Sequence, residues 1–389
     1  MPAPRVISDD HYGTADHGAM IADRRRIRAY SDALRQAIKP DSIVLDIGTG
    51  VGIFALLACQ FGARRVIAVE PDDVIDLARE LAVDNGYEAR IEFIQDVSTN
   101  VTLDQPADVI VSDLRGTLPL YRQHIPVIMD ARERLLARGG SMIPREDRIW
   151  AAVVDERQSY RRYLEAWRDA AGLDMETPRG LVANSMWATR LGRAPFLSDA
   201  QRWAALDYRT IAHPNVSGSL EWAISRPGLG HGISLWFEAV LADGVGFSVS
   251  PRSRESTYRS AFFPFPEPLR LELGDMVSAT MQASLIGTDY VWRWDTVVTA
   301  GDDPERTIAS FEQCTLNGVL PRELDRVTAT HVPTLNEHGR LDALVLARMS
   351  SRLSLDEIAR EILGEFPDRF AAWDEAFDYV AGISARYGR

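Results

Sequence analysis

The sequence has little cysteine, little histidine and no long apolar segment. Its 389 residues include only 2 cysteines and 7 histidines. Two cysteines cannot form a disulfide framework or a zinc cluster, and no histidine pair has metal-ligand spacing, so we expect no metal site. No apolar run approaches the roughly 20 residues of a membrane span, and the first residues, MPAPRVISDD, lack the apolar centre of a signal peptide. We therefore expect a cytoplasmic protein without a membrane partner.

Basic residues are also fewer than acidic residues. The chain has 43 lysines and arginines against 56 acidic residues, which gives a formal net charge of -13. A nucleic-acid-binding protein needs a basic face that displaces counterions from phosphates, so we expect no nucleic-acid partner. Hydrophobic residues make up 46% and charged residues 25% of the chain, which are ordinary values for globular domains. The length allows two or three domains of roughly 100–200 residues each.

The first 145 residues alternate between strand and helix patterns. Apolar residues recur at helical spacing before the first buried strand. We expect helices at 25–38, 53–61 and 73–84, and strands at 42–47, 65–69, 91–94 and 108–112. This alternation is typical of a parallel sheet covered by helices. We therefore predict an α/β, Rossmann-like domain over residues 1–145, which ends near Gly139, Gly140 and Pro144.

The pattern changes after Arg145. Short segments with alternating apolar residues predict antiparallel strands, at 148–154, 219–224, 233–240 and 276–283. We predict a β domain over residues 146–331, interrupted by a more helical insertion over roughly 157–206. A linker at 332–336 then leads to a small helical unit over residues 336–389. Within it, Ser354 and Glu357 form a capping box that opens a helix, and Pro367 separates this helix from the last one.

Three closely spaced glycines follow the first predicted strand. Gly48, Gly50 and Gly52 form a G-x-G-x-G turn between a strand and a helix. Glycines at such a turn accept positive φ and let the backbone approach a ligand closely. A glycine pattern alone also fits a nicotinamide-cofactor fingerprint. The spacing differs, however, from the G-x-G-x-x-G of dinucleotide enzymes, in which the glycines help to cradle a pyrophosphate.

Acidic residues near the turn favour S-adenosylmethionine (SAM) as the cofactor. Asp46 lies inside the strand just before the first glycine, as in the usual methyltransferase motif. Glu70, followed by Pro71, ends the second strand about twenty residues later, where a carboxylate can accept both ribose hydroxyls. Asp96 and Val97 follow the next strand, a common place for adenine contacts. The alternative is that Glu70 is only a solvated strand end.

From Tyr12 to about residue 300 the chain resembles the protein arginine methyltransferases. The pattern His17-x-x-Met20-x-x-Asp23-x-x-Arg26-x-x-x-Tyr30 resembles the N-terminal helix of that family. The resemblance implies that Met20 flanks the methyl-bearing sulfonium and that Arg26 pairs with the methionine carboxylate, for which an arginine fork is well suited. The alternative is that Arg26 is a surface charge.

Later segments carry the same resemblance. Residues 155–160 and 172–175 resemble the start of the family's β-barrel and its helical dimerisation arm, and 246–251 resemble the strand before its threonine-histidine-tryptophan loop. The resemblance implies a Rossmann-like domain followed by a β-barrel-like domain with a helical arm. It also implies a homodimer.

The acceptor residues of the family are not retained. The family uses two glutamates in a loop after the fourth strand to hold the substrate guanidinium; here the first is the shorter Asp113 and the second aligns with Arg122. The family's threonine-histidine-tryptophan triplet aligns with residues 256–258, without its histidine. A guanidinium stays protonated at ordinary pH, and Arg122 near Arg115 would repel it. The sequence therefore disfavours arginine as the acceptor.

An acceptor loop with arginines would suit an anionic group. We expect a peptide or a small natural-product intermediate as the substrate, methylated through an anionic oxygen that needs little base catalysis. Asp113, Arg115 and Arg122 would shape the acceptor site. An amine or hydroxyl acceptor would need a base, for which Asp113, His17 and His124 are the candidates. Alternatively, Arg115 and Arg122 are solvated or pair with Asp113.

Two alternatives to this function remain open. The chain is either an unusual arginine methyltransferase, or a catalytically silent relative that binds SAM as a scaffold. The C-terminal unit loosely resembles winged-helix modules that bind precursor peptides in natural-product pathways. The alternative for this unit is a packing or oligomerisation element, and its many acidic residues oppose DNA binding.

Overall fold

The computed structural model describes residues 13–168, 171–191, 195–253, 256–320, 326 and 330–388. Tyr12, where the family resemblance begins, lies outside the described residues. The chain divides into two compact units, Met1–Val319 and Leu320–Arg389, and each is described by itself.

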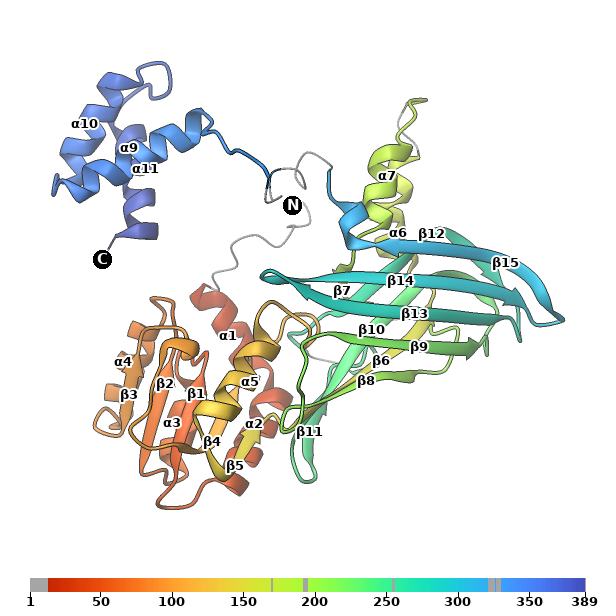
Figure 1. Ribbon diagram of the computed structural model, residues 1–389, viewed down its shortest axis with the longest axis horizontal. Coiled ribbons are helices and arrows are strands. Elements are labelled where there is room, and N and C mark those ends of the chain that lie inside the picture. Colours follow the sequence, from red (N-terminus) through yellow and green to blue (C-terminus); the bar gives the residue numbers. More distant parts are fainter. Residues whose placement is uncertain are drawn as a thin grey trace. The chain divides into compact units, whose positions relative to one another are not determined.

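A five-stranded parallel sheet forms the first part of the larger unit (Figure 1). Its strands lie in the order β3-β2-β1-β4-β5, with bounds β1 (Ile43–Ile47), β2 (Arg65–Val69), β3 (Ile91–Ile94), β4 (Ala107–Ser112) and β5 (Leu136–Ile143). The helices are α1 (Thr14–Ala22), α2 (Arg24–Ala37), α3 (Ile53–Gln60), α4 (Ile75–Asp84) and α5 (His124–Arg134), with the 3-10 turn η1 (Ser98–Asn100). The strand order reverses between β1 and β4, and ligands bind at the carboxyl ends of strands at such a switch point.

Strand β5 is absent from the sequence-based prediction. Gly139 and Gly140 suggest the end of the domain, but both lie inside β5, which pairs with β4. The pairing register shifts between Ala107 and Val109, opposite the segment that contains the glycines. Glycine within a strand often marks such an irregularity, and this irregularity hides β5 from a search for regular strand patterns.

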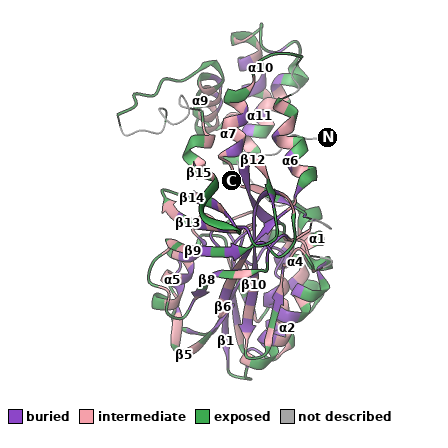
Figure 2. Ribbon diagram, turned by 90° about the vertical axis from the view of Figure 1, so that its right-hand side faces the viewer, coloured by how far each residue is buried: buried purple, intermediate pink, exposed green. Residues whose placement is uncertain are grey.

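Antiparallel strands make up the rest of the larger unit. They are β6 (Glu146–Val154), β7 (Trp187–Thr189), β8 (Gln201–Asp207), β9 (Val216–Ala223), β10 (Gly228–Ala242), β11 (Val245–Ser248), β12 (Ser260–Leu271), β13 (Met276–Ile286), β14 (Asp289–Ala300) and β15 (Asp303–Cys314). One sheet has the order β7-β12-β10-β6-β8, with β11 paired to β10, and the other β15-β14-β13-β9. The strands thus form two sheets, and their closure into a barrel stays a prediction. Figure 2 shows buried residues concentrated in central strands such as β1, β6 and β10.

The helical insertion is shorter than the sequence indicates. Its helices are α6 (Arg157–Tyr163), η2 (Glu165–Trp167) and α7 (Glu176–Ala183). After Ala183 the chain rejoins the sheet that contains β6, β10 and β12. Strand β7 pairs with β12, and β8 pairs with β6. Another 3-10 turn, η3 (Thr315–Gly318), follows β15.

The C-terminal unit has its own apolar core. Its helices are α9 (Glu337–Ser350), α10 (Leu355–Glu365) and α11 (Trp373–Tyr387). The predicted capping box is confirmed, because the Ser354 hydroxyl accepts from the Glu357 amide and the Glu357 carboxylate accepts from the Ser354 amide. Buried residues from all of these helices pack together, among them Leu341, Val345, Ile358, Ile362, Val380 and Ile383.

Candidate active site

The three-glycine turn lies at the carboxyl end of β1. Gly48, Gly50 and Gly52 have φ values of 70°, 53° and 83°, a region that other residues rarely adopt. A Cβ at Gly48 would lie 2.3 Å from Leu114 Cδ2, and one at Gly50 would lie 2.8 Å from His17 Cε1. The amides of Gly48 and Thr49 donate to Val69 O at the end of β2. Glycine is therefore required by both the φ angles and the close neighbours.

Asp46 supports this turn from inside the sheet. The carboxylate is fully buried and accepts from the Thr49 hydroxyl at 2.6 Å and from the Ala55 amide at 3.1 Å. Its other oxygen has no hydrogen-bond partner among the described residues. Burial raises the pKa of Asp46 to about 7. The side chain thus links the turn to the start of α3.

Glu70 lies at the neighbouring strand end, directly beside the turn. Its Oε2 accepts from the Gly50 amide at 2.9 Å, and its Oε1 accepts from the Asp72 amide at 3.1 Å. The residue is 8% exposed, and this burial raises the pKa of Glu70. Each carboxylate oxygen keeps a further lone pair, so Glu70 can also accept ribose hydroxyls. Pro71 follows it at the surface.

Asp96 and Val97 follow β3 at the same edge of the sheet. The Asp96 carboxylate accepts from the Val97 amide at 2.7 Å and from the Asn100 side-chain amide at 2.8 Å. Asp96 is exposed and Val97 is 45% exposed. Both are therefore accessible at the carboxyl edge, where the sequence analysis places the adenine.

Helices α1 and α2 bring three predicted residues to this edge. His17 lies against Gly50, and burial lowers the pKa of His17. The carbonyl of Met20 accepts from Arg26 Nη1 at 3.2 Å. Arg26 is 6% exposed and therefore is not a surface charge. Its Nε donates to Asp113 Oδ2 at 2.6 Å, so Arg26 joins the predicted cofactor site to the acceptor loop.

Asp113, just after β4, is the centre of a buried charge network. Its Oδ1 accepts from Arg115 Nη1 at 2.7 Å and from the Tyr258 hydroxyl at 2.6 Å, while its Oδ2 accepts from Arg26. Burial alone would raise the pKa of Asp113, but the positive charges of Arg26 and Arg115 and these hydrogen bonds lower it to about 2. Asp113 is therefore an ionised anchor, and a weak candidate for a catalytic base.

Arg115 does not offer a free guanidinium to an acceptor. Its Nε and Nη2 donate to the two oxygens of Asp147 at 2.6 and 3.0 Å, and its Nη1 donates to the Tyr30 hydroxyl at 2.7 Å as well as to Asp113. The side chain is fully buried. The expectation that Arg115 faces an anionic acceptor is corrected by this pairing, because its charge is already matched by two carboxylates.

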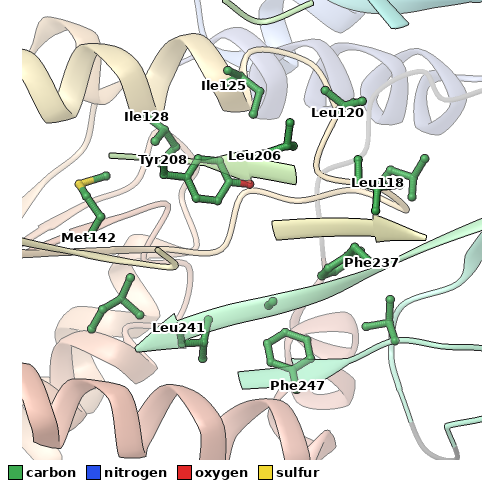
Figure 3. Packing of buried hydrophobic residues seen from close by; sticks show 14 of the residues in the cluster. Leu118, Leu120, Ile125, Ile128, Met142, Leu206, Tyr208, Phe237, Leu241 and Phe247 are labelled. Carbon is green, nitrogen blue, oxygen red and sulfur yellow. The ribbon is translucent and has the colours of Figure 1, made fainter. Parts of the chain in front are cut away.

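The network continues into the junction between the parallel sheet and the antiparallel sheet. The Tyr208 hydroxyl donates to Asp147 Oδ2 at 2.6 Å and lies 3.0 Å from His124 Nε2. Figure 3 shows the Tyr208 ring among apolar side chains such as Ile128 and Leu206. Burial lowers the pKa of His124 to about 3. His124 is thus a buried packing residue, which removes it from the candidate bases.

Arg122 lies on the acceptor loop with a positive φ of 42°. Its guanidinium carbon is 5.2 Å from the centre of the Tyr121 ring. Arg122 forms no ion pair with any carboxylate in the described part of the chain. It therefore differs from Arg115, and its charge remains partly accessible.

Several residues of this site cannot be assigned a role from the sequence alone. Tyr30 and Tyr258 occur in the motifs that carry the resemblance, but the motifs do not indicate the contacts of Tyr30 with Arg115 and of Tyr258 with Asp113. Asp23 caps α2 and also accepts from the Thr257 amide at 3.0 Å, which joins α2 to the triplet at 256–258. Asp147 and Tyr208 gave no sequence signal, because their partners are distant in the chain.

The described residues give no sign of a metal site. No group of three or more histidine, cysteine, aspartate or glutamate side chains in this part of the chain is placed to hold a metal ion. Within the same part, no helix has both the length and the apolar composition needed to cross a membrane.

Two family profiles match different parts of the chain. Residues 29–125 match the ribosomal protein L11 methyltransferase (PrmA) family, and residues 146–290 match the arginine methyltransferase oligomerization subdomain. The first match covers the parallel sheet through β4, and the second covers most of the antiparallel strands.

Curated relatives are named as protein arginine methyltransferases. Protein arginine N-methyltransferase 1 of Saccharomyces cerevisiae is 28% identical over 287 residues, covering 71% of this chain and 82% of the relative. Protein arginine N-methyltransferase 6 of Xenopus laevis is 28% identical over 271 residues, covering 66% and 79%.

Solved structures share the fold. A Trypanosoma brucei PRMT1 enzyme-prozyme heterotetrameric complex with AdoHcy has a TM-score of 0.71 at 23% identity, covering 78% of this chain and 98% of that chain. Arabidopsis thaliana protein arginine methyltransferase 10 has a TM-score of 0.68 at 21% identity, covering 78% and 97%. The chain is a SAM-dependent methyltransferase similar to the protein arginine methyltransferases, and its cofactor is SAM.

Proposed function

We propose that this SAM-dependent enzyme methylates an acceptor carried by a peptide or protein, as a divergent relative of the protein arginine methyltransferases. The observation that carries the proposal is the arrangement of the neighbouring ends of β2, β1 and β4. They place Glu70, the glycine turn and Asp113 side by side, and Arg26 reaches Asp113 from α2. Donor and acceptor groups would thus meet at one edge of the sheet.

The residues at this edge of the sheet would have separate roles in binding SAM and the acceptor. SAM supplies an electrophilic methyl group for in-line transfer. Gly48, Gly50 and Gly52 would let the cofactor approach the backbone, Glu70 would hold its ribose and Arg26 its carboxylate. Asp113, held ionised by its neighbours, would supply the negative charge nearest the acceptor.

Arginine is the first candidate acceptor. Its support comes from the relatives, since those described above are named protein arginine methyltransferases. An ionised Asp113 attracts a guanidinium. If Arg26 turned towards the cofactor's carboxylate, Asp113 Oδ2 would become available to an acceptor.

A second candidate is an acceptor other than arginine on the peptide or protein. It is favoured by Arg122, whose charge lies in the acceptor loop without a carboxylate partner among the described residues. Its other support is the occupation of Asp113 by three donors. Such a site suits an anionic oxygen, which is already nucleophilic and needs orientation more than a base.

Product analysis tests the proposal and separates the two acceptors. The full chain is incubated with methyl-labelled SAM and either an arginine-rich peptide or a peptide rich in aspartate and glutamate. Acid-stable methylarginine supports the first candidate, whereas a base-labile methyl ester supports the second. The contradicting result is a protein that binds SAM but transfers no label, either to these peptides or to the proteins of a cell extract. That result would exclude a peptide or protein acceptor.

We also propose that the enzyme acts as a homodimer. The match of residues 146–290 to an oligomerization subdomain supports this, as does the oligomeric assembly named for the Trypanosoma brucei structure. The molar mass from light scattering tests it, and a monomer at the concentrations used in the assay would contradict it.

The C-terminal unit, residues 336–389, is proposed to recognise a peptide or protein partner. Support comes from its separate core and its division from the rest of the chain. Deletion from residue 331 onward should leave SAM affinity unchanged and raise the KM for the acceptor. An unchanged KM would instead assign it a packing role.

A further inference from the structure

Helix α6 carries an exposed arginine cluster on an otherwise acidic protein. Residues 157–168 contain four arginines and one glutamate, although the whole chain has a net charge of -13. Arg157, Arg161 and Arg162 are exposed, and together with Gln158 they border an open, shallow stretch of surface on α6. We call these three arginines the α6 arginine cluster.

The carboxylates nearest the cluster only partly neutralise it. Arg157 lies 3.5 Å from Asp155, and Arg161 lies 3.5 Å from Glu165, with arginine side-chain exposures of 61% and 70%. Exposed pairs at this distance contribute little. Arg162 has no carboxylate partner among the described residues, and its guanidinium lies 5.3 Å from the centre of the Tyr163 ring. The cluster therefore keeps positive charge for a partner.

The helix that carries these arginines is firmly anchored. Tyr160 is fully buried, and its hydroxyl lies within hydrogen-bond distance of the carbonyls of Phe265 and Pro266 in β12. The Glu156 carboxylate caps the helix by accepting from the Ser159 amide at 2.9 Å. Figure 1 shows α6 beside β12. The arginines thus project from a fixed base, which lowers the conformational entropy lost when a partner binds.

A short series of contacts connects this helix to the acceptor site. The Ser159 hydroxyl lies 2.7 Å from the Thr189 hydroxyl, and Thr189 pairs with Ser260, two residues after Tyr258. Tyr258 donates to Asp113. Next to Thr189, Arg190 donates to the Ser256 carbonyl at 2.8 Å. These contacts fix α6 relative to the segment that carries Tyr258, so the cluster and the acceptor region keep a constant spacing.

We propose that the α6 arginine cluster binds an acidic segment of the peptide or protein acceptor, at a distance from the methylated group. This inference rests on the proposed peptide or protein acceptor. Three exposed guanidinium groups on one fixed helix attract and orient carboxylates. A short acidic segment fits better than a nucleic acid, because the net charge of -13 repels every anion and opposes a long phosphate backbone more than a few carboxylates.

Fluorescence anisotropy of the full chain tests this binding without turnover. The probes are a short labelled peptide of alternating glutamate and glycine, a lysine-glycine counterpart and a single-stranded oligonucleotide. We expect the acidic peptide to bind most tightly, with weaker binding at higher salt. Replacing the cluster (R157Q/R161Q/R162Q) should weaken it about tenfold. The matched control R270Q/R293Q/R306Q removes exposed, acid-paired arginines of the β strands and should leave it unchanged.

The outcomes are distinguishable. Equal weakening in both triple variants, or no weakening in the cluster variant, would overturn the proposal. Tighter binding of the oligonucleotide through the cluster would overturn the acidic-peptide assignment. A change of molar mass in the cluster variant alone would assign the surface to a second copy of the chain. Failure of the proposed methyl transfer would appear separately, as absence of labelled product while SAM affinity and peptide binding persist.

Discussion

The ends of β1 and β2 and the end of β4 are neighbours in the sheet, but different forces organise them. At β1 and β2, backbone geometry dominates: three glycines have positive φ. The Gly48 amide donates to Val69 O, the Gly50 amide to the Glu70 carboxylate and the Gly52 amide to Thr49 O. At β4, charged side chains dominate, with Asp113 and Asp147 surrounding Arg115 in full burial. The backbone turn is local in sequence, whereas the charge network joins residues far apart in the chain.

The difference shows how each region should respond to mutation. A glycine turn is sensitive to any added Cβ, because φ and space are both fixed. A buried charge network is sensitive to the loss of one partner, because the remaining charge then lacks compensation. Mutations in the two regions should therefore change different measurable quantities.

The largest effect on stability should come from removing the positive partner of the buried charge network while its carboxylates remain. Arg115→Met leaves Asp147 buried without its bidentate partner, so we expect a loss of about 3–5 kcal/mol in the free energy of unfolding. R115M/D147A removes both charges and should recover at least about 2 kcal/mol of that loss. Urea unfolding measures both values. A single variant that loses less than about 1 kcal/mol would show that the network is not structural.

The next effect concerns the glycine turn. Gly48→Ala places a Cβ 2.3 Å from Leu114 Cδ2 at a φ of 70°, and we expect SAM affinity to fall at least about 100-fold, or about 2.7 kcal/mol. Gly86→Ala is the matched control, because its φ is 69° but its Cβ would meet open space. The control should lose about 1 kcal/mol of stability and keep its SAM affinity by calorimetry. Equal losses of affinity would assign the effect to backbone strain alone.

A third prediction uses the lowered pKa of Asp113. An acid whose folded pKa is lowered stabilises the protein above its ordinary pKa, and that contribution disappears as the pH falls through the folded value. With the pKa of Asp113 at about 2 against an ordinary value of 3.8, the stability difference between wild type and Asp113→Asn should shrink by about 2 kcal/mol between about pH 5 and pH 2. A difference that stays constant over this range would contradict the assigned ion pairs.

The smallest predicted change separates the two acceptors. Arg122→Glu restores an acid at the second acceptor position, so kcat/KM for an arginine peptide should rise about tenfold, or about 1.4 kcal/mol. A fall in activity on a carboxylate peptide would instead identify an anionic acceptor. Arg138→Glu, in β5 and away from the acceptor loop, is the charge-matched control.

Much of the donor region could be predicted from the sequence, because it depends on local patterns. The strands at 65–69 and 91–94 and the spacing of Gly48, Gly50 and Glu70 define it within one continuous stretch. The acceptor region could be predicted only in part. The loss of the family's second glutamate at Arg122 was visible, but the burial of Arg115 depends on Asp147 and Tyr30, which no local periodicity connects to it.

The antiparallel strands show the same limit. Four of them have alternating patterns that the sequence predicts, and the alternation of Trp292 and Trp294 also indicates β14, but β12 and β15 were not predicted as strands. In β12 the alternation is lost, because its first six residues are all buried. Such positions are set by neighbouring strands, and a single sequence does not reveal those neighbours.

Calorimetric titration of SAM into wild type and Glu70→Gln most directly tests whether the ends of β1 and β2 form the cofactor site. Glutamine keeps the size of the side chain but is neutral and replaces one carboxylate oxygen by an amide NH2, so it cannot accept from the Gly50 amide, the Asp72 amide and the ribose as the carboxylate does. The account predicts saturable binding to the wild type and at least about tenfold weaker binding to the variant, with the free energy of unfolding changed by less than about 1 kcal/mol. Equal affinity of the two proteins for SAM would contradict it.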